Sequence, residues 1–132
     1  MVTLCKIDGK SYDVLVTAVQ EAVEIKEGPN IGVAIARNRE IRDITGIMFG
    51  HSITFDCDND PVVFDELYSY LFENIRPSVM LEVVHNQKTI TYEAAYNTGS
   101  RSVSRINDDT NEVYWTELTV DFRPIENQIN AE

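Results

Sequence analysis

One stretch of the sequence, from Asp60 to Pro77, predicts a helix with defined ends and therefore constrains the fold most strongly. The carboxylate of Asp60 can cap the first turn, and Pro61 suits the first helical position because its missing N–H would have no partner there. Pro77 ends the pattern, since proline cannot continue a helix. Between them, apolar residues recur every three or four positions and form one stripe: Phe64, Leu67, Tyr68, Leu71 and Ile75. We therefore expect a helix over residues 61–75.

Alternation of apolar and polar residues predicts about seven strands in the rest of the chain. The segment 12–25 alternates only loosely, so we expect one long strand that is twisted or bulged. Asp8-Gly9 predicts a tight hairpin turn between the first two strands, because glycine tolerates the positive φ that such a turn requires. The predicted strands cover residues 3–7, 12–25, 46–57, 79–84, 89–96, 103–106 and 114–123.

These elements predict an α+β fold, an antiparallel β-sandwich or incomplete barrel with the helix flanking it. The helix stripe is expected to pack on residues 79–83 and 118–122 of two predicted strands. A length of 132 residues suits one domain. We expect that domain to span residues 1–124, and the polar segment 125–132 to be a frayed tail.

The net charge of the chain limits its partners. Asp and Glu outnumber Lys and Arg by 22 to 11, which gives a formal charge of −11. This excess repels phosphates, so we expect DNA to be at most a passing cargo and never a bound ligand. The first residues lack a basic segment followed by an apolar one, and no apolar run is long enough to span a bilayer, so a cytoplasmic protein is expected. Cys5 and Cys57 are then expected to be buried thiols without a disulfide.

Two patterns of metal-ligating residues stop short of a metal site. Asp56, Asp58 and Asp60 have the spacing of a calcium loop, but proline and leucine follow where that loop needs glycine and glutamate. Four residues of the types that bind zinc also occur, but none of them is in the closely spaced pairs of structural zinc sites: Cys5, His51, Cys57 and His85. We expect neither a metal nor a cofactor.

Catalytic motifs are equally missing from the sequence. No Gly-x-Ser-x-Gly elbow occurs, and the glycine-rich stretches lack the following Gly-Lys-Ser/Thr of a phosphate-binding loop. Carboxylates near Cys57 would raise the pKa of its thiol and make it a poorer nucleophile. The sequence therefore favours a structural or binding protein over an enzyme.

The segment 28–43 has no clean period, carries several isoleucines and holds three arginines in an otherwise acidic chain. Arginine is suited to forked hydrogen bonds with carboxylates of a neighbouring subunit. We hypothesise that this segment is an inter-subunit arm. The candidate interface residues are Ile31, Ile35, Arg37, Arg39, Ile41 and Arg42.

The stretch from Glu27 to Phe55 resembles small proteins from the tail regions of phages and prophages of Gram-positive bacteria, which carry Gly-x-Asn-x-Gly and then Arg-Asp-Ile-x-Gly. Asp-Glu-Leu-Tyr at 65–68 and Ile-Thr-Tyr-Glu-Ala at 90–94 also fit. The residues that match the two motifs are Gly28, Asn30, Gly32, Arg42, Asp43, Ile44 and Gly46.

This resemblance implies a tail-tube-like fold and a structural role as a tube, hub, distal or terminator-type tail protein. Its implied partners are further copies of the chain, in a ring that is possibly hexameric, and other tail proteins. It also implies a location in the host cytoplasm during assembly and afterwards in the virion tail. Because a fold does not fix a function, the choice among these roles rests on analogy.

Two other functions are compatible with the same elements. One is a small-ligand binding barrel or barrel enzyme with the helix as a lid, which would need a deep apolar pocket with a few polar groups. The other is a tail assembly chaperone or adaptor that acts as a monomer or dimer. Light scattering over a concentration series would separate a ring-forming protein from both.

Overall fold

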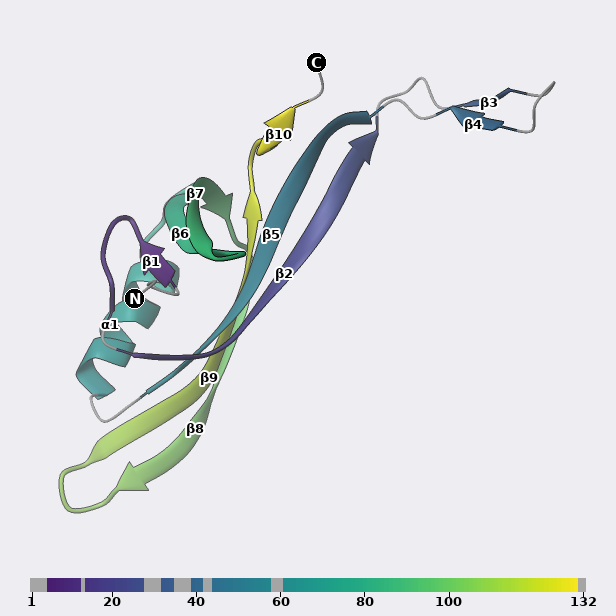
Figure 1. Cartoon of the computed structure of the whole chain (residues 1–132). Helices are drawn as coiled ribbons and strands as arrows, with labels where there is room; N and C mark the ends of the chain where they lie inside the picture. Colours follow the sequence, from purple (N-terminus) through teal and green to yellow (C-terminus); the bar gives the residue numbers. More distant parts are fainter. Residues whose placement is uncertain are drawn as a thin grey trace.

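The chain folds mainly as antiparallel β-sheet. A computed structural model describes residues 5–12, 14–27, 32–34, 39–41, 44–57 and 61–130, and these ranges contain ten strands and one helix (Figure 1). The bounds are β1 Cys5–Ile7, β2 Leu15–Glu27, β3 Gly32–Ala34, β4 Arg39–Ile41, β5 Ile44–Asp56, α1 Pro61–Phe72, β6 Val79–His85, β7 Lys88–Ala95, β8 Gly99–Asn107, β9 Glu112–Pro124 and β10 Ile129–Asn130.

Strand β9 joins two layers of the fold. Its Leu118–Phe122 portion pairs with β5, whereas Arg123 and Pro124 pair with β7. The first layer has the strand order β1-β6-β7, and the second has the order β2-β5-β9-β8, with β10 added to β5. Beyond the end of β9, β10 pairs with β5 but not with β7, so the barrel is not closed within the described residues. The α+β sandwich or incomplete barrel predicted from the sequence is confirmed, and the predicted strands correspond to β1, β2 and β5 to β9.

The helix packs on the sheet through the predicted stripe. Phe64, Leu67 and Leu71 are buried, as three- and four-residue spacing on one helix face requires. They belong to one core cluster with strand residues from both layers, as expected for the helix-facing strands. From the two segments predicted to face the helix, the cluster contains Val79, Leu81, Val83, Leu118, Val120 and Phe122.

The prediction that the helix reaches residue 75 and buries Ile75 is wrong. Helix α1 ends at Phe72, and Ile75 is fully exposed. The carbonyl of Ser69 accepts hydrogen bonds from the Glu73 N–H at 3.0 Å and from the Asn74 side chain at 2.9 Å. These bonds satisfy a carbonyl of the last turn, so the chain leaves the helix before Pro77. The predicted cap, Asp60, lies outside the described residues.

The Asp8-Gly9 turn forms as predicted, but it does not join two paired strands. Asp8 and Gly9 have φ values of 50° and 81°, the left-handed region that favours glycine. However, β1 pairs with β6 and β2 pairs with β5. The reason lies in Asp8, whose carboxylate accepts hydrogen bonds from the Met80 N–H at 2.7 Å and from the Tyr70 hydroxyl. These bonds hold the turn against β6 and α1.

The long second strand is bulged, as its loose alternation predicted. The pairing with β5 shifts between Val16 and Ala18, so Thr17 is an extra residue in β2. One extra residue inverts the alternation of faces, and Val19 is therefore half-buried in place of Ala18. The β8–β9 pairing shifts twice: between Ser100 and Ser102 the extra residue is in β9, and between Val103 and Arg105 it is in β8.

The C-terminal segment differs from the frayed tail that was expected. Ile129 pairs with Ile47 of β5, and the Gln128 N–H donates to the Ile47 carbonyl at 3.1 Å. The Gln128 side chain accepts a hydrogen bond from the Phe49 N–H at 3.0 Å and donates one to the Phe49 carbonyl at 2.9 Å. A side-chain amide therefore stands where a strand residue would pair.

Candidate functional site

The structure describes only part of the hypothetical inter-subunit arm. Ile31, Ile35, Arg37 and Arg42 lie outside the described residues. Arg39 and Ile41 belong to β4, which pairs with β3 in a short ribbon. This ribbon lies beyond the ends of β2 and β5, away from α1 (Figure 1). The interface role of these six residues stays a prediction.

Of the four residues considered as zinc ligands, the fold brings together only the two histidines, His51 and His85. Glu21 bridges them, whereas neither cysteine belongs to a disulfide among the described residues, and Cys57 is half-buried where a buried thiol was expected. Burial, and to a smaller extent the nearby Glu82, raises the pKa of the Cys5 thiol to about 12, so this thiol stays protonated and unreactive. Among the described residues, no group of three or more metal-ligating side chains is arranged to hold a metal ion.

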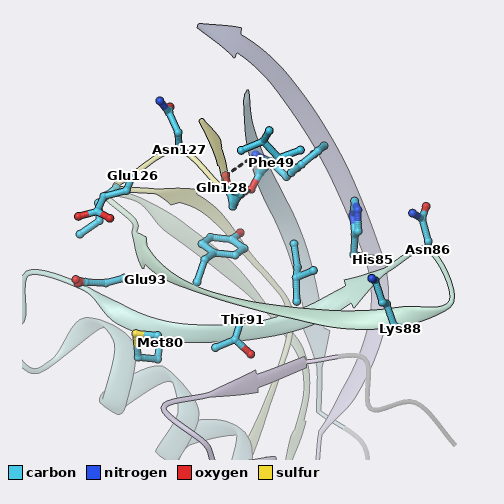
Figure 2. Close-up of a pocket in the computed structure, with 14 residues that line it drawn as sticks. Phe49, Met80, His85, Asn86, Lys88, Thr91, Glu93, Glu126, Asn127 and Gln128 are labelled. Carbon is cyan, nitrogen blue, oxygen red and sulfur yellow. Dashed lines mark hydrogen bonds between the residues drawn. The ribbon is translucent and has the colours of Figure 1, made fainter. Parts of the chain in front are cut away.

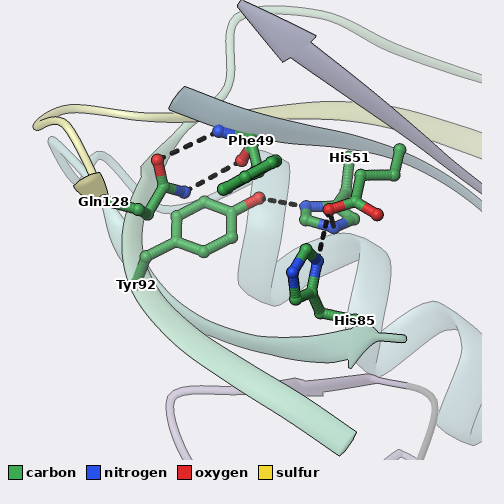
Figure 3. Close-up of polar contacts among 6 residues, drawn as sticks. Phe49, His51, His85, Tyr92 and Gln128 are labelled. Atoms are coloured by element: carbon green, nitrogen blue, oxygen red, sulfur yellow. Dashed lines mark hydrogen bonds and ion pairs between the residues drawn. The ribbon is translucent and has the colours of Figure 1, made fainter. Parts of the chain in front are cut away.

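The histidines belong to a polar network that links four strands (Figure 3). His51 Nδ1 of β5 lies 2.8 Å from the Tyr92 hydroxyl of β7. Glu21 Oε1 of β2 lies 2.6 Å from His85 Nδ1 of β6 and 3.7 Å from His51 Nε2. The His51 side chain is buried, and its Nε2 has no hydrogen-bond partner among the described residues.

The charges around His51 indicate which of its ring nitrogens carries the proton. A proton on Nε2 is attracted to the Glu21 carboxylate, so Nδ1 accepts the hydrogen bond from the Tyr92 hydroxyl. Burial raises the pKa of Tyr92 above its usual range, which keeps this hydroxyl protonated as a donor. Burial also lowers the pKa of His51, against an upward effect of Glu21, and His85 lowers it further. The network is thus built around a neutral His51.

We expect acid to destabilise the fold through His51. Its pKa is about 6.5 when the chain is unfolded and lower when it is folded, so the unfolded state binds more protons below that pH. The contribution of His51 to the free energy of unfolding is therefore complete above pH 6.5 and is lost as the pH falls through its folded pKa. Urea denaturation at pH 8.0, 6.5 and 5.5 would measure this loss.

The matched variant for this experiment is His51→Gln, which can still bond to Tyr92 but does not titrate. Carboxylates also respond to acid, so the comparison is between the two pH dependences and not between absolute stabilities. The variant should lose less stability between pH 6.5 and 5.5 than the wild type does. Identical losses in the two proteins would contradict a buried neutral His51.

The network borders a wedge-shaped pocket between β7 on one side and β5 with the segment 125–129 on the other (Figure 2). Its volume is about 730 Å³, which is within the range of ligand sites. Phe49, Ile90 and Tyr92 provide largely apolar walls, and Tyr92 and His85 belong to both the pocket wall and the network. No described residue of α1 lines this pocket, so the helix is not its lid.

Sequence reasoning missed most of this site. His51 and His85 were noticed, but only as metal ligands. Glu21, Tyr92 and Gln128 gave no signal, because each looks like an ordinary strand or tail residue and its partners are distant in the chain. The register of β2 against β5, which places Glu21 opposite His51, is the feature that assembles the network.

A scan against protein-family models, a search of curated proteins and a search of solved structures each gave no match. Among the described residues, no helix combines the length and the apolar character needed to cross a membrane.

Proposed function

We propose that this protein is a ring-forming structural subunit, of the kind found in phage and prophage tails. The observation that supports this most directly is a pair of open sheet edges with opposite charge. Within the described residues, β2 pairs only with β5 and β8 pairs only with β9, so these strands form the two edges of the second layer.

Both edges are exposed over nearly their whole length. In β2, all residues except Val16, Val19 and Lys26 are exposed, and in β8 only Arg101 is half-buried. Exposed apolar side chains accompany the unpaired backbone, such as Val23 in β2 and Ile106 in β8. A long open edge of this kind is a template for pairing with another chain.

The charges favour pairing of unlike edges. Strand β2 contains three glutamates and one lysine, whereas β8 contains two arginines and no acidic residue. Pairing β2 with a second β2 would place like charges together, which is unfavourable, while pairing β2 with β8 brings opposite charges together. Such a head-to-tail contact uses different surfaces on each subunit, so it continues from copy to copy and closes into a ring when the geometry permits.

The remaining support comes from the overall charge and from the resemblance to tail-region proteins. A ring of subunits that each carry a charge of −11 repels phosphate and lets DNA pass as cargo. Its further partners would be other tail proteins, and its place would be the host cytoplasm during assembly and then the virion tail. In this role the protein is not an enzyme.

The proposal is tested by the mass of the assembly, measured by light scattering coupled to size-exclusion chromatography over a concentration series. We expect the wild type to form a closed oligomer of more than two subunits. Val23→Lys in β2 and Ile106→Glu in β8 should each weaken association at least tenfold, because each removes an apolar contact and reverses the local charge. Added salt should weaken the wild-type assembly, because it screens the attraction between the oppositely charged edges.

The helix offers a matched control. Val62, Val23 and Ile106 are equally exposed, at 61% each, so Val62→Lys introduces the same charge at an apolar surface position away from both edges. It should leave the assembly unchanged. Mixing the Val23→Lys and Ile106→Glu proteins should give a heterodimer, because each retains one intact edge. A monomeric wild type, or a dimer unaffected by either edge substitution, would refute the ring proposal.

A further inference from the structure

A third open edge lies inside the fold, along β7. This strand pairs with β6 from Lys88 to Ala94, but with β9 only at Ala94 and Ala95. The Glu93 carbonyl accepts a hydrogen bond from the Ile125 N–H at 3.1 Å, so the peptide groups of Glu93 face away from β6. Since alternate residues of an antiparallel strand share an edge, those of Thr89 and Thr91 face the same way.

This edge opens into the wedge-shaped pocket. Thr91 and Glu93 line it, and no described strand pairs with β7 beside Thr91. On the opposite wall, Gln128 already occupies the peptide groups of Phe49. The β7 side of the wedge therefore offers backbone donors and acceptors for pairing, whereas the peptide groups of Phe49 on the other side are already hydrogen-bonded to Gln128.

The wedge also has exposed apolar surface and separated charges. Met80, Ile125 and Ile129 are about half-exposed and line the pocket together. Glu93 and Glu126 lie at one end, and Lys88 with His85 lies at the other (Figure 2). Clustered apolar side chains on a surface indicate an interaction site, and the separated charges give it a direction.

We propose that the wedge binds an extended segment of another protein, which adds to β7 as a strand. Its peptide groups pair with Thr89 and Thr91, its alternate apolar side chains face Phe49 and Ile90, and a basic side chain lies at the Glu93 and Glu126 end. Backbone pairing supplies affinity in this binding mode, and side-chain pockets supply selectivity. This inference does not depend on ring formation, since β7 belongs to the other layer.

The probe is an acetylated hexapeptide of alternating threonine and valine that begins with arginine. The comparison peptide is the same hexapeptide beginning with glutamate. Binding is followed by NMR on the isotopically labelled full chain, through shifts and hydrogen exchange of the backbone amides. We expect the arginine peptide to protect Thr89 and Thr91 and to bind at least tenfold more tightly than the glutamate peptide.

Substitutions at two positions, Thr91 and Glu93, identify the edge. Thr91→Pro removes an N–H that faces the wedge and leaves the ladder with β6 intact, so binding should fall at least tenfold, whereas Thr91→Val should preserve it. Glu93→Lys should reverse the preference between the two peptides, and this variant keeps the test decisive if Thr91→Pro does not fold. Unchanged Thr89 and Thr91 amides at millimolar peptide would overturn the proposal. Protection of these amides that appears without peptide and disappears on dilution would also overturn it, because a second copy would then fill the wedge.

Discussion

Leu71→Ala is expected to lower the free energy of unfolding by about 2–5 kcal/mol. Leu71 is buried and belongs to the same core cluster as Val79 and Leu118 from the two layers. Removing its side chain leaves a cavity where the helix meets both layers. The measurement is the midpoint and slope of urea denaturation.

Ile75→Ala is the matched control for this prediction. Both residues were expected in the same stripe, but Ile75 is fully exposed because α1 ends before it. Its substitution should change the free energy of unfolding by no more than about 0.5 kcal/mol. Equal losses for the two variants would mean that Leu71 does not anchor the helix.

Gly99→Ala is expected to lower the free energy of unfolding by about 1–3 kcal/mol. A Cβ at this position would overlap the ring of Phe72, the last residue of α1. That ring cannot easily turn aside, because it packs edge-to-face on Tyr96 with ring centres 5.5 Å apart and lies 5.4 Å from Tyr68. The Tyr96 hydroxyl also donates to the Leu71 carbonyl at 2.5 Å, which holds Tyr96 in place.

Ser100→Ala serves as the comparison, since Ser100 is the exposed neighbour of Gly99 in β8. Ser100→Ala should be nearly neutral in urea denaturation, which is the measurement for both variants. If Gly99→Ala were as stable as Ser100→Ala, the end of the helix would have to be free to shift away from β8.

The sequence predicted local structure better than pairing. Alternation in β9 placed Leu118, Val120 and Phe122 on one face, and all three are buried. The Asp8-Gly9 turn was also predicted, because positive φ is a local requirement. The pairing of β1 with β6 was not predicted. Asp8 holds β1 against β6 through hydrogen bonds with Tyr70 and Met80, which lie more than 60 positions away in the sequence.

The candidate site was less predictable for the same reason. His51 and His85 were recognised by residue type alone, and the bridging Glu21 comes from a strand whose register follows a bulge. The tail was expected to be frayed because its composition is polar. Gln128 instead pairs with a peptide group of β5, a use of a side chain that composition cannot reveal.

The bulges in the two outer strands have a consequence for what their open edges can pair with. Bulges in β2 and β8 bend and coil each strand locally, so neither edge is a flat ribbon. Amyloid-like stacking requires flat, in-register strands, and a coiled edge accepts only a neighbour with matching curvature. The irregularities that interrupt the ladders therefore act against indiscriminate edge-to-edge pairing and still allow pairing with a strand of matching curvature.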